Sequence, residues 1–318
     1  MRCAILDDYQ KAALSMADWS RLEGRVAITP FHDHLDDEDT LAERLVGFDV
    51  IVIMRERTPF PASLLSRLPQ LKLLITSGMR NAAIDIAAAR ERGITVCGTD
   101  SHPAPPAELA WALILGLARH VTTEHHHFTT NGPWQSTVGM TLAGRTLGII
   151  GLGKIGTRMA RIAKAFDMEV MAWSEHLTPV RCEEAGVIHA RSKKALMCAS
   201  DIVSIHLVLS TRTHHLIDRQ AFEWMSPSSL LINTSRAGIV DQTALIDILK
   251  EGRIAGAGLD VFEQEPLPLD HPLRRLPNVL TTPHLGYVSD TNYRTWFGQA
   301  VENIEAWLSG TPIRRLSG

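Results

Sequence analysis

The stretch Leu147-Gly148-Ile149-Ile150-Gly151-Leu152-Gly153-Lys154-Ile155-Gly156 decides the fold of this 318-residue chain. An apolar, strand-like run leads into three glycines, a helical pattern follows over 157–166, and a second strand-like run covers Glu169–Trp173. In such a unit Gly151 permits a tight turn, Gly153 lets the backbone approach a pyrophosphate, and Gly156 lets helix and strand pack closely. The free N–H groups at the start of the helix then attract the phosphates. The stretch predicts a dinucleotide-binding βαβ unit whose loop contacts the cofactor through Gly151, Leu152, Gly153, Lys154, Ile155 and Gly156.

The end of the second strand bears on the choice between NAD and NADP. NAD sites place an acid there to hold the ribose 2′-hydroxyl. Ser174 stands at that position and leaves room for a 2′-phosphate, whereas Glu175 beside it would repel one if it points that way. We therefore expect NAD or NADP as the cofactor, with Glu175 favouring NAD.

Similar runs extend in both directions from this unit. Short apolar runs alternating with helical patterns indicate parallel strands covered on both faces. The proline-dense segment 101–106 separates two such series and marks a domain boundary, in keeping with a length that suggests two domains. The runs are Cys3–Leu6, Val26–Pro30, Val50–Met54, Leu71–Thr76 and Ile94–Cys97, and then Thr146–Ile150, Glu169–Trp173, Ile202–Leu207, Leu230–Thr234, Ala257–Val261 and Val279–Thr281.

The overall charge argues against a nucleic-acid partner. The chain has 32 Lys+Arg and 35 Asp+Glu, a formal net charge of −3, whereas a polyphosphate-binding protein normally shows a basic excess. The longest apolar stretch, Leu109–Ala118, is too short for a membrane span, which needs about 20 residues. The N-terminus reaches Asp7 before a signal-peptide core could form. We expect a cytoplasmic protein with no membrane partner.

Neither the cysteines nor the histidines form a metal-binding pattern. The four cysteines are far apart and contain no CxxC pair, which also makes a disulfide framework improbable. The run His125-His126-His127 falls on adjacent positions, and adjacent residues of a helix do not share a face. We therefore expect no metal site.

Polar residues with catalytic chemistry follow three late strands. Arg236 comes just after one strand, acidic residues including Glu265 follow the next, and His284 follows the last. Ligands of open α/β sheets bind outside the carboxyl ends of the strands, so these side chains can meet. A histidine can give or take a proton, a carboxylate can orient its ring, and an arginine can hold a carboxylate with two prongs. This set suits hydride transfer to or from a carbonyl.

In four ordered motifs, the chain resembles the D-isomer-specific 2-hydroxyacid dehydrogenases. The motifs are GLGKIG at 151–156, INTSRAG at 232–238, DVFEQEP at 260–266 and TPHLG at 282–286. The resemblance implies a Rossmann-type cofactor domain, 101–287, inserted into a flavodoxin-like substrate domain, 1–100 and 288–318. It also implies a homodimer formed through the cofactor domains.

The resemblance also implies roles for individual residues. Arg236 would bind the substrate carboxylate and carbonyl, and Glu265 would pair with His284, the general acid/base. Asp260 would contact the nicotinamide carboxamide. The cofactor would be bordered further by His206, Leu207, Thr234 and Gly286.

Two segments depart from the family's pattern. The substrate loop usually reads Gly-x-Gly, and here Gly78 is followed by Met79 and then by Arg80 in place of the second glycine. We expect the backbone N–H groups of Gly78 and Met79 to cradle a carboxylate and Arg80 to add a charge. After Gly286, Tyr287 replaces a second glycine and is a further candidate substrate contact.

Together these features predict an NAD(P)-dependent oxidoreductase that transfers a hydride between nicotinamide and C2 of a small D-2-hydroxy acid or 2-oxo acid. The alternative is a non-catalytic NAD(H)-binding regulatory module on the same fold. The complete arginine, glutamate and histidine set favours the enzyme.

Overall fold

The computed structural model describes residues 1–317, and these form two compact units. One unit combines Met1–His102 with the chain from Val288 onward, and the other is Pro103–Tyr287. The chain therefore passes between the units twice, after His102 and after Tyr287. Both units contain a parallel sheet with helices on its faces, so the predicted α/β class is confirmed.

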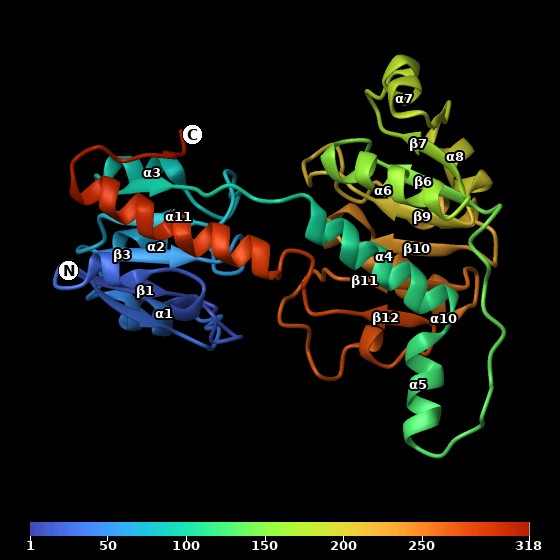
Figure 1. Ribbon diagram of the computed structural model, residues 1–318, viewed down its shortest axis with the longest axis horizontal. Coiled ribbons are helices and arrows are strands. Elements are labelled where there is room, and N and C mark those ends of the chain that lie inside the picture. The colour runs from blue at the N-terminus through green and yellow to red at the C-terminus, as the bar shows by residue number, and fades with distance from the viewer. Residues whose placement is uncertain (318) are drawn as a thin grey trace. The chain divides into compact units, whose positions relative to one another are not determined.

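The first unit is built on a five-stranded parallel sheet in the order β2-β1-β3-β4-β5. This is the order of a flavodoxin-like doubly wound sheet. The middle strands β3 and β4 are apolar and fully buried because helices cover both faces. The strands are β1 (Arg2–Ile5), β2 (Ala27–Pro30), β3 (Val50–Ile53), β4 (Leu73–Thr76) and β5 (Thr95–Cys97). The helices are α1 (Glu38–Leu45), α2 (Ala62–Ser66), α3 (Ile86–Glu91) and α11 (Asp290–Leu308), with short 3-10 turns at Ala13–Ser15 and Trp19–Leu22 (Figure 1).

The second unit contains a seven-stranded parallel sheet in the order β12-β11-β10-β9-β6-β7-β8. The order reverses between β6 and β9, and a doubly wound sheet binds its ligand at such a switch point. The strands are β6 (Thr146–Ile150), β7 (Glu169–Trp173), β8 (Ile188–His189), β9 (Ile202–Ile205), β10 (Leu230–Asn233), β11 (Gly256–Leu259) and β12 (Val279–Thr281).

Helices cover both faces of this second sheet. Two apolar clusters fill the space: α4 and α6 pack in one, and α8, α9 and α10 pack in the other. The helices are α4 (Ala104–Ala118), α5 (Val121–Thr129), α6 (Lys154–Ala165), α7 (Pro179–Ala185), α8 (Lys193–Ala199), α9 (Arg219–Glu223) and α10 (Gln242–Lys250), with 3-10 turns at Ala237–Ile239 and Pro272–Arg274. Figure 1 shows α5 projecting away from the sheet beyond α4.

Two helices and one strand show features that the apolar runs of the sequence do not reveal. Helix α4 begins at Ala104 and takes Pro105 and Pro106 into its first turn, where backbone N–H groups have no intrahelical partner. The polar stretch after His120 is a second helix, α5, none of whose side chains is buried. The two-residue strand β8 is too short to show an apolar run and was missed.

None of the described helices is long and apolar enough to cross a membrane. Over residues 1–317, no group of three or more His, Cys, Asp or Glu side chains is arranged to hold a metal ion.

Candidate active site

The glycine loop joins β6 to α6 at the switch point of the second sheet. Gly151 has φ +101°, and a Cβ there would lie 2.5 Å from the His206 carbonyl oxygen. Because an L side chain rarely adopts that φ and has no space here, only glycine fits. Helix α6 starts at Lys154, three residues earlier than the helical pattern indicates, and no side chain caps its first turn. Its first N–H groups therefore face the loop without a side-chain acceptor.

Two observations fit a dinucleotide at this loop. A Cβ added to Gly153 would have no atom within 4 Å, so the space beside it is open. The Thr234 hydroxyl, just past β10, is buried and has no hydrogen-bond partner among the described residues. Buried polar groups are nearly always paired, so this hydroxyl indicates a ligand or water in its place. Leu152 is buried beneath the loop, whereas the Lys154 side chain is exposed and Ile155 is partly buried.

At the end of β7, Ser174 is followed by two exposed side chains that meet an arginine. Arg212 Nη1 lies 2.7 Å from His176 Nε2 and 3.9 Å from Glu175 Oε2. The Glu175 side chain is thus close to a cation supplied by the segment after β9. The sequence did not single out Arg212, because only the fold brings a position 37 residues downstream to this strand end.

His206, at the end of β9, contributes to the loop through its backbone. Its carbonyl oxygen and the Leu207 side chain both border Gly151. Its ring Nε2 lies 2.8 Å from the Ser204 hydroxyl. Burial lowers the pKa of His206 to about 4, so the ring is neutral near pH 7. Because its ring is neutral and hydrogen-bonded to Ser204, His206 borders the glycine loop and is not expected to carry a proton.

Asp260 has a different environment from the one expected. Its side chain is fully buried just past β11. One carboxylate oxygen accepts hydrogen bonds from Thr282 Oγ1 (2.6 Å) and Leu285 N (2.7 Å), and the other accepts one from Gly286 N (2.8 Å). Burial raises the pKa of this carboxyl above its ordinary value, against the opposing effect of these donors. These bonds show that Asp260 braces residues 282–286, and its expected contact with a nicotinamide carboxamide stays a prediction.

The braced segment 282–286 carries His284. His284 has φ +54°, a conformation that a non-glycine residue adopts only where its surroundings impose it. Its Nδ1 lies 2.6 Å from Glu265 Oε2, while Glu265 Oε1 accepts the Phe262 N–H at 2.9 Å. No hydrogen bond within the described chain involves Nε2. The glutamate thus fixes the ring, and the opposite nitrogen is the one available for proton transfer.

Tyr287 is packed against the same histidine. The two ring centroids lie 5.2 Å apart in an edge-on arrangement, and the Tyr287 side chain is buried. This geometry does not test the predicted role of Tyr287 as a substrate contact. It shows that the Tyr287 ring lies beside the His284 imidazole. Gly286, predicted to border the cofactor, has its N–H directed at Asp260.

Arg236 follows β10 at the same sheet edge, and a buried asparagine sets its backbone. Asn233 Nδ2 donates to the Arg236 carbonyl at 3.0 Å, and Asn233 Oδ1 accepts the Ser235 N–H at 3.0 Å. Ser235 Oγ in turn donates to the Ile205 carbonyl at 2.7 Å. Asn233 and Ser235 belong to a motif that the sequence showed, but their function as braces could be read only from the hydrogen bonds. The guanidinium is partly exposed.

The substrate loop of the first unit follows β4. The Gly78 N–H donates to Thr99 Oγ1 at 2.9 Å, and its expected part in a carboxylate cradle stays a prediction. Met79 is half-exposed, and Arg80 is exposed with no ion pair or hydrogen bond to the described residues. Asn81 is buried and braces the loop: its Nδ2 donates to the Arg55 carbonyl and to Thr76 Oγ1.

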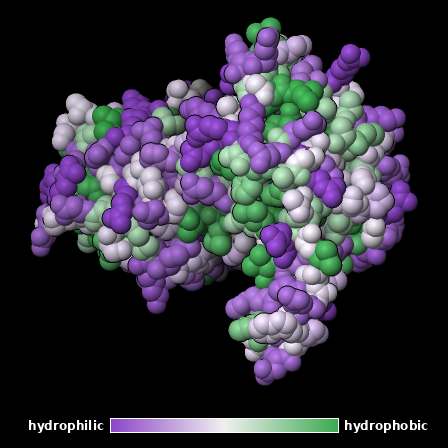
Figure 2. Space-filling model, turned by 45° about the vertical axis from the view of Figure 1, so that its right-hand side comes forward, coloured by the Kyte–Doolittle hydropathy of each residue, from purple (hydrophilic) through white to green (hydrophobic). Residues whose placement is uncertain are grey.

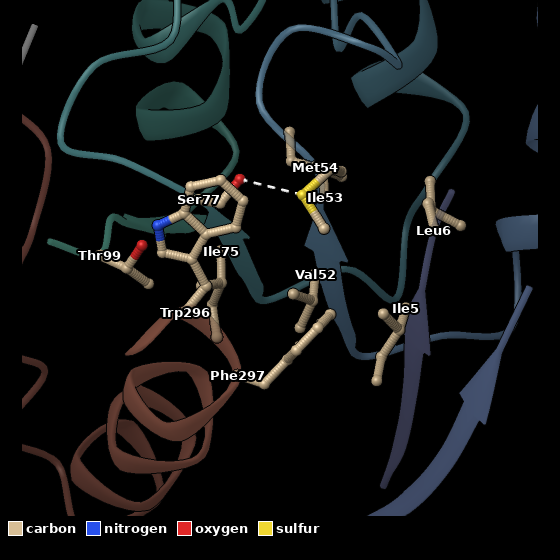
Figure 3. Close-up of a pocket in the computed structure, with 10 residues that line it drawn as sticks. All are labelled: Ile5, Leu6, Val52, Ile53, Met54, Ile75, Ser77, Thr99, Trp296 and Phe297. Carbon is tan, nitrogen blue, oxygen red and sulfur yellow. Dashed lines mark hydrogen bonds between the residues drawn. The ribbon is translucent and has the colours of Figure 1, made fainter. Parts of the chain in front are cut away.

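Beneath this loop lies a small, mainly apolar pocket inside the first unit. Figure 3 shows strand side chains such as Ile75 facing Trp296 and Phe297 of α11, with Ser77 and Thr99 at the polar end. The Ser77 hydroxyl lies 3.5 Å from Met54 Sδ and accepts the Arg55 N–H at 2.9 Å. Of the residues that line the pocket, none carries a cationic side chain.

Comparisons with known proteins identify the family of the chain. The family model for the NAD-binding domain of D-isomer specific 2-hydroxyacid dehydrogenases matches residues 111–286. A glyoxylate reductase of Korarchaeum cryptofilum is 36% identical over 277 residues, covering 85% of this chain and 82% of that protein. A hydroxypyruvate reductase of Thermotoga maritima is 35% identical over 260 residues, covering 80% and 82%. A crystal structure of a phosphoglycerate oxidoreductase from Vibrio cholerae O395 is 38% identical, with a TM-score of 0.94 over 98% of this chain and 99% of that one.

A Rossmann-type sheet with a complete glycine loop and a histidine–glutamate pair at its carboxyl edge is that of a nicotinamide-dependent oxidoreductase. With the matches above, the chain belongs to the D-isomer-specific 2-hydroxyacid dehydrogenase family. It is an NAD-dependent enzyme of that family.

Replacing Gly153 by alanine separates cofactor binding from folding. Because no atom of the protein lies near the added Cβ, we expect an unchanged thermal midpoint. The same Cβ would occupy the space proposed for the pyrophosphate, so the Kd for NADH should rise about 10-fold or more. Thermal denaturation and NADH fluorescence titration measure the two effects. Gly151→Ala is the contrasting variant and should lower the midpoint as well, and unchanged NADH binding in Gly153→Ala would contradict the assignment.

Proposed function

We propose that the protein interconverts a D-2-hydroxy acid and its 2-oxo acid, with His284 as the general acid/base. The observation that carries this proposal is the Nδ1–Glu265 contact of 2.6 Å, which leaves Nε2 as the working nitrogen. When bound, the nicotinamide supplies or accepts a hydride at C4. No observation favours the alternative of a non-catalytic module.

Reduction of a 2-oxo acid adds a hydride to C2 and a proton to the carbonyl oxygen. His284 in its protonated form donates that proton from Nε2, and in the reverse direction the neutral ring accepts it. The Glu265 carboxylate stabilises the cationic ring and holds its orientation. The loop held by Asp260 keeps the ring in place while the proton moves, so no reorientation is needed during the reaction.

Arg236 is proposed to bind the substrate. A guanidinium can hold a carboxylate through two parallel hydrogen bonds and also polarise the neighbouring carbonyl. The Asn233 brace fixes the backbone from which this side chain extends. In the unit of Met1–His102, the Met79 N–H and the exposed Arg80 are proposed as further carboxylate contacts. The substrate class is a small 2-oxo acid of the kind named for the relatives, glyoxylate or hydroxypyruvate.

The acid/base proposal predicts the effect of His284→Ala. Loss of the proton donor should lower kcat by about 100-fold or more, while the Kd for NADH changes little because the ring is not part of the glycine loop. Glyoxylate and hydroxypyruvate turnover with NADH, together with a fluorescence titration, gives both quantities. His125→Ala, on the exposed face of α5, serves as the matched control. Turnover retained in His284→Ala would refute the mechanism.

The cofactor preference is proposed to be NAD over NADP. Glu175 stands next to the position where a 2′-phosphate would lie, and a like charge there opposes the phosphate. Arg212, 3.9 Å from Glu175, is a cation that could instead pair with that phosphate. Both side chains are exposed, so the repulsion is screened and NADPH is discriminated against without being excluded.

Removing the Glu175 charge tests this preference. Glu175→Gln should raise the ratio of kcat/KM for NADPH to that for NADH by about 10-fold, since about 1.4 kcal/mol corresponds to one such factor. The control is Glu184→Gln, which removes an exposed charge paired with Arg181 on α7. An unchanged ratio would show that Glu175 does not set the choice.

The protein is further proposed to be a homodimer that associates through its cofactor-binding unit. Helix α5 and the segment after it, residues 121–141, form a projecting arm (Figure 2) with the exposed apolar side chains Phe128, Trp134 and Val138. The Phe128 and Trp134 rings lie 6.0 Å apart. Clustered, exposed aromatic side chains are typical of protein interfaces.

The arm is already ordered in the single chain. Glu124 accepts hydrogen bonds from the Ser136 and Thr137 hydroxyls, which lower the pKa of its carboxyl to about 2. A preformed surface loses little entropy on association, which favours a stable interface.

The dimer proposal predicts that Trp134→Asp yields a monomer. A buried charge at the centre of an apolar contact should break the association, and light scattering coupled to size-exclusion chromatography measures the mass. Val180→Asp is the control, since Val180 is an exposed apolar residue on α7 outside the arm. A monomeric wild-type protein, or a dimeric Trp134→Asp variant, would contradict the proposal.

A further inference from the structure

The chain after α11 forms a strap along the edge of the first sheet. We call residues 311–317 the C-terminal strap. Pro312, Arg314 and Leu316 are partly buried, and the residues between them are exposed, which is the alternation of a strand. The Gly98 N–H donates to the Arg314 carbonyl at 2.9 Å, and the Leu316 N–H donates to the Val96 carbonyl at 2.9 Å. The strap thus pairs with β5 and its continuation in an antiparallel sense.

A buried asparagine of α11 fixes the strap to the same place. Asn303 is fully buried, and its Nδ2 donates to the Gly98 carbonyl at 2.8 Å. Its Oδ1 accepts a hydrogen bond from Arg314 Nη1 at 3.1 Å. Arg314 itself has φ +49°, so its backbone is held in an uncommon conformation. Both polar groups of Gly98 are therefore bound, one by the strap and one by α11.

Gly98 is also where the strap meets the substrate loop. A Cβ on Gly98 would lie 2.6 Å from the Gly78 carbonyl oxygen, 2.8 Å from Leu316 Cδ1 and 2.9 Å from Met79 Sδ. Because Gly98 has no side chain, the strap and the substrate loop can both approach its α-carbon. Thr99 continues the connection, because its hydroxyl accepts the Gly78 N–H at 2.9 Å and its own N–H donates to the Gly78 carbonyl at 3.3 Å.

We propose that the C-terminal strap is a positioning element of the substrate loop, acting through Leu316 Cδ1 and Met79 Sδ, which both lie close to Gly98. This inference rests on the proposed function, in which the Met79 N–H binds the substrate carboxylate. The Asn81 brace holds the far end of the loop, while Met79 is half-exposed and has support on the Gly98 side. Leu316 touches no substrate, and its effect passes through the backbone of residues 78–79.

The test compares two leucine-sized truncations on the same strap. Leu316→Ala removes the partly buried contact, and Ile313→Ala, at an exposed position, is the matched control. We expect Leu316→Ala to raise the KM for glyoxylate about 5- to 10-fold with kcat and the Kd for NADH unchanged, because a loop displaced by a fraction of an ångström binds the carboxylate poorly. Ile313→Ala should behave as the wild type, and Leu316→Met should restore the KM.

A second measurement does not depend on activity. Amide hydrogen exchange over residues 77–80 should be faster in Leu316→Ala than in Ile313→Ala, with exchange in β6 and α6 unchanged. Equal KM values and equal exchange in the two variants would overturn the proposal. A parallel loss of kcat, NADH affinity and thermal midpoint would also overturn it, since it would show general destabilisation. If wild-type protein reduces no 2-oxo acid, the proposed function fails, and the exchange comparison still decides whether the strap holds the loop.

Discussion

The Asp260 carboxylate, buried past β11, accepts three hydrogen bonds from residues 282–286. A buried carboxylate is costly unless donors satisfy it, so the segment after β12 must bring its N–H groups to this point. That requirement fixes the path of the chain through His284 and explains why this residue tolerates a positive φ. The imidazole is thereby brought to Glu265 by hydrogen bonds of residues one or two positions away from His284. The position of the His284 ring therefore depends on this anchor as well as on its contact with Glu265.

The site also depends on the parallel sheet, because the sheet brings a basic, an acidic and an imidazole side chain to one edge. Strands β10, β11 and β12 are neighbours, so Arg236, Asp260 and His284 all lie past the carboxyl ends of adjacent strands. The environments of the three side chains differ: the Asp260 carboxylate is buried and braces the chain, whereas His284 and Arg236 are partly exposed. His206 extends the same logic at β9, where burial keeps the ring neutral and leaves it a structural part of the glycine loop.

The glycine loop and the parallel sheets could be predicted because their sequence signals are local. The glycine pattern that begins at Gly151, between Ile150 and Leu152, can be recognised from the sequence alone. Buried parallel strands likewise appear as short apolar runs. The family was confirmed by the comparisons. Asp260 shows where such reasoning ends: the motif located a carboxylate correctly, but only three long-range donors reveal that it braces a loop. Arg212 was missed for the same reason, since its approach to Glu175 depends on the pairing of β7 and β9 with the two sides of β6.

The first unit shows the same division between local pattern and distant contact. Gly78 carries the family's glycine, yet its N–H is used by Thr99, a residue of the segment after β5. The position of the substrate loop is consequently set by Gly98, Asn303 and the C-terminal strap. Asn303 and the strap are more than two hundred residues away from the loop in the sequence. Because the strap follows the last helix, the chain closes on its own substrate loop only when the whole fold has formed. The backbone position of residues 78–79 is therefore a property of the completed tertiary structure, and a net charge of −3 spread over the chain has no bearing on it.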